Sequence, residues 1–171
     1  MTELSLVIRP EQSMDAEAIE RLHERAFGPG RFARTAQRLR EGAPHLVELS
    51  FTALVGTLLV GSVRLSPLTA GEVPGLMLGP LTVDPAFESR GIGAALMRRS
   101  IEAAREQGHT LVLLVGDEPY YSRFGFRRIP RGQLELPGPV NPDRFLALEL
   151  VDGILEKAKG PVRPRPVPPR P

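Results

Sequence analysis

The segment DPAFESRGIGAALM, residues 84–97, joins an apolar run to a helical pattern and decides the fold. The run before it, LMLGPLTV at residues 76–83, predicts a central strand that is covered on both faces. The helical pattern extends over residues 91–107. Glycine is a poor helix former, so Gly91 and Gly93 at the junction indicate either tight packing of strand on helix or a ligand that approaches the backbone.

The rest of the chain supplies further alternating and helical patterns. We expect strands at residues 4–9, 45–55, 58–65, 110–115, 126–129 and 145–150. We expect helices at residues 14–27, 31–41, 118–124 and 152–159. Ser13 is the expected N-cap of the first helix and Gly108 the C-cap of the helix that ends at residue 107. Residues 66–75 contain two prolines and two glycines and are expected to form a loop.

This order combines a hairpin meander with one strand–helix–strand crossover. It predicts a mixed α/β (α+β) fold, with a mostly antiparallel sheet of about seven strands and flanking helices. Residues 1–160 are expected to form a single domain. Residues 161–171, PVRPRPVPPRP, are expected to be an extended or disordered Pro/Arg-rich tail that buries little.

Composition and charge exclude several classes of function. The 171 residues carry 22 basic and 20 acidic side chains, and residues 1–160 alone carry 19 and 20. A nearly neutral body does not support a nucleic-acid-binding surface. The chain has no cysteine, which rules out disulfides, thiolate metal sites and cysteine nucleophiles and fits a cytoplasmic location. No run is long and apolar enough to cross a membrane, and residues 1–8 do not resemble a signal peptide.

A strand, then RGIG at residues 90–93, then a helix is an arrangement suited to phosphate, because the amides of a first helical turn have no intrahelical partners. Arg90 would add a charge. A P-loop requires G-x-x-x-x-G-K-[ST], which is absent. A dinucleotide fingerprint requires a third glycine or alanine where this chain has Leu96, and it follows the first strand of its fold rather than the fourth. The pyrophosphate of coenzyme A and simple tight packing of the glycines both remain open at this point.

A second motif makes the pattern more specific. After the strand at residues 110–115 comes VGDEPYYSRFGF, residues 115–126. Together with the strand at residues 76–83 and ESRGIG at residues 88–93, it resembles the GNAT superfamily of N-acetyltransferases, in particular its YhbS-like bacterial branch. The resemblance extends over residues 4–150. It departs from the family pattern Q/R-x-x-G-x-G/A at one position, where this chain has Glu88.

The resemblance implies a GNAT fold, in which the fourth and fifth strands splay apart, and acetyl-CoA as cosubstrate. The pantetheine arm would pair with the fourth strand near Leu81 and Val83, and a backbone N–H near Val83 would polarise the thioester carbonyl. The pyrophosphate would lie on the amides of the loop and first helical turn. Its binding residues would be Arg90, Gly91, Ile92, Gly93 and Ala94.

Tyr121 stands four residues before Gly125 and matches the general acid of the family, which protonates the leaving thiolate. Tyr120 is adjacent, and a shift of one residue would exchange their roles. The sequence does not identify a base. The acidic candidates are Glu48, Glu72, Asp84 and Asp117, and a water chain is equally open. His23, His45 and His109 lack the spacing of metal ligands, so no metal is expected.

The sequence therefore predicts an acetyl-CoA-dependent N-acetyltransferase. Its acceptor would be the amine of a small molecule or a protein, taken up near residues 27–34, 68–75 and 133–141. Arginines on the helix at residues 31–41 either favour an acidic acceptor or face solvent. The alternative is a non-catalytic acyl-CoA-binding or scaffold protein whose Pro/Arg tail recruits a partner. The family resemblance allows a homodimer, for which the sequence has no feature of its own.

Overall fold

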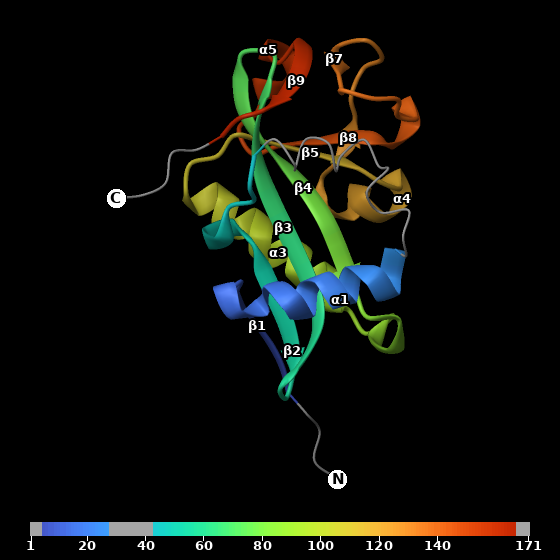
Figure 1. The fold of residues 1–171 in the computed structure, drawn as a ribbon. Coiled ribbons are helices and arrows are strands. Elements are labelled where there is room, and N and C mark those ends of the chain that lie inside the picture. The colour runs from blue at the N-terminus through green and yellow to red at the C-terminus, as the bar shows by residue number, and fades with distance from the viewer. Residues whose placement is uncertain (1–4, 28–42, 167–171) are drawn as a thin grey trace, which may run out of the picture.

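The computed structural model describes residues 5–27 and 43–166, and its centre is a sheet of nine strands. The main path of the sheet is β1-β2-β3-β4-β5-β8-β6, with β7 and β9 joined to it through β3 (Figure 1). Neighbours on this path are antiparallel except β4 and β5, which confirms the predicted mixed, mostly antiparallel sheet. The strands are β1 (Leu6–Pro10), β2 (Phe51–Val55), β3 (Leu58–Ala70), β4 (Val73–Val83), β5 (Leu111–Val115), β6 (Arg127–Arg128), β7 (Leu134–Glu135), β8 (Phe145–Glu149) and β9 (Gly160–Pro164).

Helices lie on both faces of the sheet. α1 (Ala16–Phe27) crosses one face, and α3 (Ile92–Glu106) packs on the other, against β2, β3 and β4 (Figure 1). Leu96 and Met97 of α3 are fully buried in the largest core cluster, and burial of each such side chain stabilises the fold by about 1.5–3 kcal/mol. The shorter helices are α4 (Glu118–Tyr121) and α5 (Ile154–Lys157).

The start of the first helix differs from the prediction. A 3-10 turn at Ser13–Asp15 precedes α1, and Gln12 rather than Ser13 is the N-cap. The Asp15 carboxylate accepts the Gln12 amide at 2.8 Å and binds Arg9 through two hydrogen bonds. This reciprocal capping box could not be recognised from the residue types that usually cap helices. The helix expected at residues 31–41 lies outside the described residues.

The strands expected at residues 58–65 and 76–83 are longer than predicted. β3 continues to Ala70 and β4 begins at Val73, so only a tight turn remains of the loop expected at residues 66–75. Residues 45–50 form no strand and include a 3-10 turn at Val47–Leu49. The extension of β3 has a structural cause, because Leu68–Ala70 pair with β9 on the side that β2 no longer covers.

β9 corrects part of the prediction that residues 161–171 form a tail that buries little; residues 167–171 lie outside the described residues. Gly160–Pro164 is a strand that pairs with β3 and with β7, and Val162 is only 3% exposed. Its prolines do not prevent this, because hydrogen bonds to β3 and its turn use the Pro161 carbonyl, which accepts the Gly71 amide, and the Arg165 amide, which donates to Pro67. The strand expected at residues 145–150 is therefore not the last one. The elements expected at residues 91–107, 110–115, 118–124, 126–129 and 152–159 are confirmed within a few residues of their ends.

A bulge and a divergence in the middle of the sheet position the site. Val63 lies opposite Leu81 and Leu65 opposite Leu78, so Gly79 and Pro80 of β4 share a single partner, Arg64. Such a bulge bends a strand. β4 pairs with β5 only at Leu76 and Met77, immediately before the bulge, and the two strands then separate. The predicted splay between the fourth and fifth strands is thereby confirmed.

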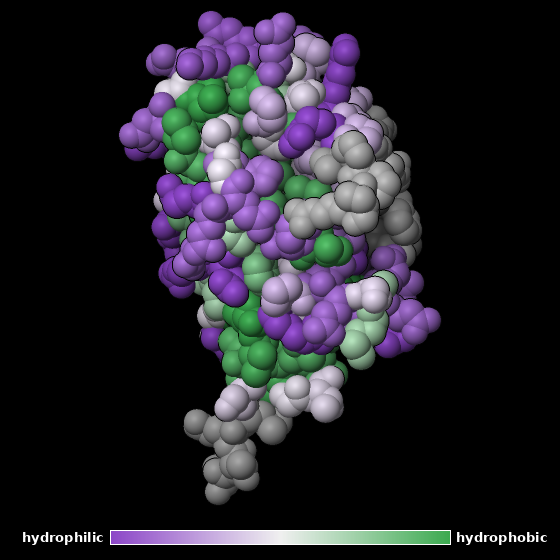
Figure 2. Space-filling view, turned by 90° about the vertical axis from the view of Figure 1, so that its left-hand side faces the viewer, coloured by the Kyte–Doolittle hydropathy of each residue, from purple (hydrophilic) through white to green (hydrophobic). Residues whose placement is uncertain are grey.

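The edge strand β1 exposes apolar side chains near the N-terminus. Leu6 is 41% exposed and Val7 52%, and Leu58 at the start of β3 is 52% exposed. Figure 2 shows hydrophobic side chains gathered at this end of the molecule. None of these three side chains lines either of the cavities described next.

Candidate active site

The N-terminus of α3 presents free backbone amides at the end of β4. Gly91 is the N-cap and has φ +79°, a left-handed conformation that favours glycine. The amides of Ile92, Gly93 and Ala94 belong to the first turn and have no partner within the helix. The positive end of the helix dipole adds to their attraction for an anion. The strand, glycine loop and helix N-terminus thus have the arrangement that the sequence predicted.

A cavity of about 390 Å³ opens in front of these amides. Its lining combines the end of β4, the loop after it, the first turn of α3 and two residues from the segment after β5. The lining residues are Val83, Phe87, Glu88, Ser89, Gly91, Ile92, Gly93, Ala94, Tyr120 and Arg123. Five of the predicted cofactor-binding residues thus border one cavity, namely Val83, Gly91, Ile92, Gly93 and Ala94.

Two arginines differ in their relation to this cavity. Arg90, expected to contact phosphate, does not line it, and its guanidinium lies 5.2 Å from the centre of the Phe87 ring. Arg123 does line it and stacks on the Tyr120 ring at 5.2 Å. Arg123 was not among the predicted binding residues, although its position inside YSRFGF was a usable signal. Glu88 is exposed at the rim, so the departure from the family pattern places a negative charge beside the cavity.

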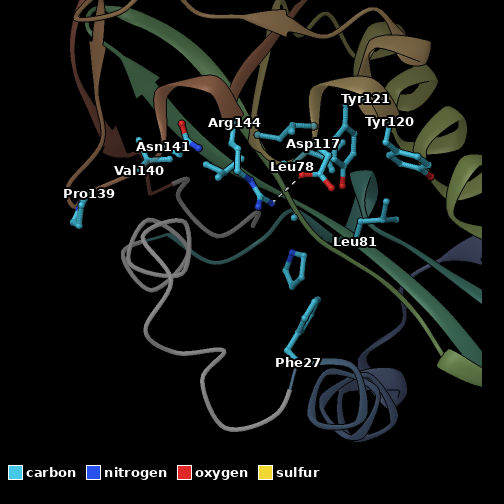
Figure 3. Close-up of a pocket in the computed structure, with 15 residues that line it drawn as sticks. Phe27, Leu78, Leu81, Asp117, Tyr120, Tyr121, Pro139, Val140, Asn141 and Arg144 are labelled. Carbon is cyan, nitrogen blue, oxygen red and sulfur yellow. Dashed lines mark ion pairs between the residues drawn. The ribbon is translucent and has the colours of Figure 1, made fainter.

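A second cavity, of about 540 Å³, lies between the diverging strands β4 and β5. Apolar side chains from α1, β4, β5 and residues 139–140 form much of its wall (Figure 3). Its polar lining residues are Asp117, Tyr120, Tyr121, Asn141 and Arg144. Leu81, the remaining predicted cofactor-binding residue, also lines it. Tyr120 borders both cavities, so the two cavities meet at this side chain.

The two adjacent tyrosines face different ways. A Cβ added at Gly93 would lie 3.1 Å from the Tyr120 hydroxyl, so Tyr120 reaches the first turn of α3. A Cβ at Gly116 would instead collide with the Tyr121 ring, which therefore lies directly on the backbone after β5. In Figure 3 the Tyr121 hydroxyl is directed into the cavity and the Tyr120 hydroxyl away from it. Only Tyr121 presents its phenol to the space between β4 and β5.

Burial raises the pKa of the Tyr121 phenol to about 12, with smaller contributions in the same direction from Tyr120 and Asp117 and an opposing one from Arg144. The phenol is therefore protonated at neutral pH and can donate a hydrogen bond or a proton. Its ring stays fixed by edge contacts with the rings of Tyr120, at 4.9 Å, and Phe126, at 6.1 Å.

Of the acidic candidates for a base, only Asp117 lines this cavity. Asp84 instead caps a 3-10 turn through the Ala86 amide and pairs with Arg25 at 3.1 Å, as a turn residue does. Glu48 and Glu72 line neither cavity.

The histidines do not form a site. His45 binds Glu11 at 2.6 Å, in a cluster that also contains Arg64. His23 is buried on α1, and burial lowers the pKa of His109. Within residues 5–27 and 43–166, no group of three or more His, Asp or Glu residues is arranged to hold a metal ion. No helix in the same ranges is long and apolar enough to cross a membrane.

Comparison with known proteins assigns the family. The sequence profile of the Acetyltransferase (GNAT) family matches residues 16–126, more than half of the chain. The chain therefore belongs to the GNAT family of acetyltransferases, which confirms the resemblance of its motifs. It is an N-acetyltransferase by family.

Its similarity to the uncharacterized N-acetyltransferase YhbS of Escherichia coli K12 is 30% identity over 157 residues, which is 91% of this chain and 93% of YhbS. YjhQ of the same organism is 33% identical over 116 residues, 66% of this chain and 64% of YjhQ. The crystal structure of Escherichia coli YhbS in complex with CoA matches with a TM-score of 0.81 and 28% identity, covering 96% of this chain and 92% of that one. A GNAT acetyltransferase from Brucella melitensis in complex with acetyl-CoA matches at 0.60 and 29%, covering 84% and 95%.

Proposed function

We propose that this chain is an acetyl-CoA-dependent N-acetyltransferase that moves the acetyl group to a primary amine by direct attack in a ternary complex. The observation that carries the proposal is the meeting of two cavities at Tyr120. One has the free amides of α3 on its wall, and the other has the Tyr121 phenol. The ligands of the similar proteins, CoA in YhbS and acetyl-CoA in the Brucella protein, support the choice of cosubstrate.

The smaller cavity fits the pyrophosphate of coenzyme A. The amides of Ile92, Gly93 and Ala94 would donate hydrogen bonds to it, and Arg123 would add a charge-assisted one. Glu88 at the rim opposes a polyanion. Because Glu88 is exposed, solvent screens its charge, whereas the amides act at contact distance.

The diverging part of β4 fits the pantetheine arm. Beyond Met77 the strand has no β5 partner on that side, so its backbone groups are free to pair with the amides of the arm. Leu81 and Val83 lie beside the first turn of α3, since a Cβ at Gly93 would be 3.7 Å from a Val83 methyl group and 4.0 Å from one of Leu81. A backbone N–H near Val83 would polarise the thioester carbonyl.

The reaction forms an N–C bond to the acetyl carbonyl and breaks its C–S bond. A primary amine must first lose a proton to solvent, because alkyl ammonium groups have a pKa near 10. After attack the nitrogen loses a second proton to water or a carboxylate. Tyr121 would donate its hydroxyl proton toward the departing sulfur and recover a proton from solvent.

Free thiol released from acetyl-CoA, measured with a panel of amines, tests the proposal. Calorimetry with acetyl-CoA and with ADP-ribose measures binding separately. Acetyl-CoA binding with amine-dependent thiol release is the expected result. Tight acetyl-CoA binding without turnover on any amine would instead support a non-catalytic acyl-CoA-binding protein, and equal binding of ADP-ribose would favour a nucleotide-binding protein.

A further inference from the structure

The Asp117 carboxylate does not cap the helix that it precedes. It stands at the N-cap of α4, where an aspartate side chain commonly accepts a hydrogen bond from the first turn, and it makes no such bond. Only its main-chain carbonyl accepts, from the amides of Tyr120 and Tyr121. Asp84 and Asn141, at comparable turn starts, both cap with their side chains. The Asp117 carboxylate is directed into the larger cavity instead (Figure 3).

Arg144 lies beside Asp117 because two backbone segments are joined there. The Arg144 carbonyl accepts the Gly116 amide at 2.9 Å, and the Arg144 amide donates to Asn141 at 2.9 Å. The guanidinium and the Asp117 carboxylate are 3.7 Å apart, longer than a hydrogen bond. Their side chains are 51% and 73% exposed, so each keeps capacity for a further partner.

From this pair we infer the class of acceptor, an inference that rests on the proposed function. Asp117 and Arg144 bind an amine that also carries a carboxylate close by, as a free α-amino acid does. A guanidinium pairs with a carboxylate through two parallel hydrogen bonds, and a carboxylate binds an ammonium or amine. An amine without a carboxylate could pair with Asp117 but would bring a second positive charge next to Arg144 and offer it no carboxylate, whereas an amino acid satisfies both residues.

The pair lies where such a ligand would react. The polar ends of Asp117, Arg144 and Tyr121 face the same space in Figure 3. An amine held by Asp117 would therefore lie beside the phenol that the proposed reaction uses. Apolar residues of the same cavity, Leu81 and Val140 among them, would contact the side chain of the amino acid.

Matched substrate pairs test the inference. Thiol release from acetyl-CoA is measured for the standard α-amino acids, for their decarboxylated amines and for their methyl esters, which keep the amine and lose the negative charge. We expect kcat/KM for the best amino acid to exceed that of its decarboxylated amine and its ester at least tenfold. In the presence of CoA, the same amino acid should raise the melting temperature and the decarboxylated amine should not.

Variants of Arg144 test whether the preference for amino acids depends on the Asp117–Arg144 pair. Arg144→Gln should reduce the preference for the amino acid over its decarboxylated amine to less than threefold, through KM, and Arg144→Lys should restore part of it. Arg131→Gln is the matched control, because Arg131 is 76% exposed, pairs with Asp143 and does not line the cavity. It removes the same charge and should leave the preference as in the parent chain.

The outcomes separate the two proposals. Turnover of amines and esters as fast as of amino acids would overturn the inference and leave the proposed function standing. A preference that survives Arg144→Gln would also overturn the assignment of these residues. If no compound is acetylated and no amino acid raises the melting temperature with CoA, the inference fails. Acetyl-CoA calorimetry then shows whether the proposed function fails with it.

Discussion

Replacement of Tyr121 by phenylalanine removes the proposed proton donor and little else. The ring keeps its edge contacts with Tyr120 and Phe126 and its position on Gly116. No hydrogen bond from the hydroxyl to the protein holds the fold in the described residues, so the free energy of unfolding should change by less than about 1 kcal/mol. Any loss of turnover then reports on chemistry rather than on stability.

The magnitude follows from the pKa of the phenol. A value of about 12 makes Tyr121 a weaker acid than a thiol of pKa about 8.5, by about 5 kcal/mol. Complete proton transfer to the thiolate would thus be uphill in water. A charge-assisted hydrogen bond to the developing thiolate contributes about 1.5–3 kcal/mol, and its loss corresponds to a decrease in kcat of about 10- to 150-fold. We expect the decrease in kcat of Tyr121→Phe to lie in this range.

Steady-state thiol release with a saturating amine measures kcat, and calorimetry measures acetyl-CoA affinity. We expect kcat to fall as stated and the affinity to change less than threefold. The pH profile provides a second readout. Because the pKa of Tyr121 is about 12, ionisation of the phenol should not reduce kcat between pH 7 and 10.

Tyr120→Phe is the matched control for the adjacent residue. The Tyr120 hydroxyl approaches Gly93 at the smaller cavity, so removal of this hydroxyl should affect acetyl-CoA affinity more than kcat. Unchanged turnover in Tyr121→Phe, combined with a loss of tenfold or more in Tyr120→Phe, would refute the assignment of the two residues. A fall in kcat that matches a fall in thermal stability would refute the chemical interpretation.

Three further predictions concern the smaller cavity and the buried charges around Glu11. Gly93→Ala should change stability little, since alanine is the better helix former by about 1 kcal/mol but its Cβ would lie 3.1 Å from the Tyr120 hydroxyl, and it should weaken acetyl-CoA binding at least threefold in calorimetry. Arg123→Gln should weaken acetyl-CoA binding more at low salt than at high salt, and an affinity loss independent of salt would contradict a charge contact. Glu11→Gln should destabilise the fold by about 2–3 kcal/mol in urea, because it leaves Arg64 without its carboxylate. Burial alone would raise the pKa of Glu11, but hydrogen bonds from His45 and Arg64 outweigh it and hold the pKa below the ordinary 4.5. Its stabilising effect is therefore full above pH 4.5 and is lost as the pH falls through the lower folded value, so the acid unfolding transition of Glu11→Gln should be shallower than that of the parent chain.

Local signals made the free amides at the N-terminus of α3 predictable. The amides of the first turn of α3 and the glycines beside them belong to one continuous segment, so strand, loop and helix propensities were enough to find them. The side chains of the larger cavity come from segments far apart in the sequence. Asp117 and Arg144 meet only because β5 pairs with β8, with Val115 opposite Phe145. No spacing in the sequence reports that pairing.

β9 was missed for a related reason. Its prolines favour an extended chain without partners, and that local preference is correct for the backbone. The sheet overrides it because the far half of β3 has a free side once β2 ends, and Val162 is buried when β9 fills that side. Gln12 illustrates the same limit on a smaller scale, since its capping role depends on Asp15 being held by Arg9 of the neighbouring strand.

The adjacent tyrosines show how a short helix can direct two neighbouring side chains to different cavities. Consecutive residues of a helix point about 100° apart, so the hydroxyl groups of Tyr120 and Tyr121 of α4 are directed to different places although both rings line the larger cavity. The Tyr120 hydroxyl lies next to Gly93 on α3, whereas the Tyr121 ring lies on Gly116 after β5. The backbone therefore fixes which phenol lies between β4 and β5. That arrangement places the free amides of α3 and the proposed proton donor in two cavities that meet at Tyr120, so one extended cosubstrate could reach both.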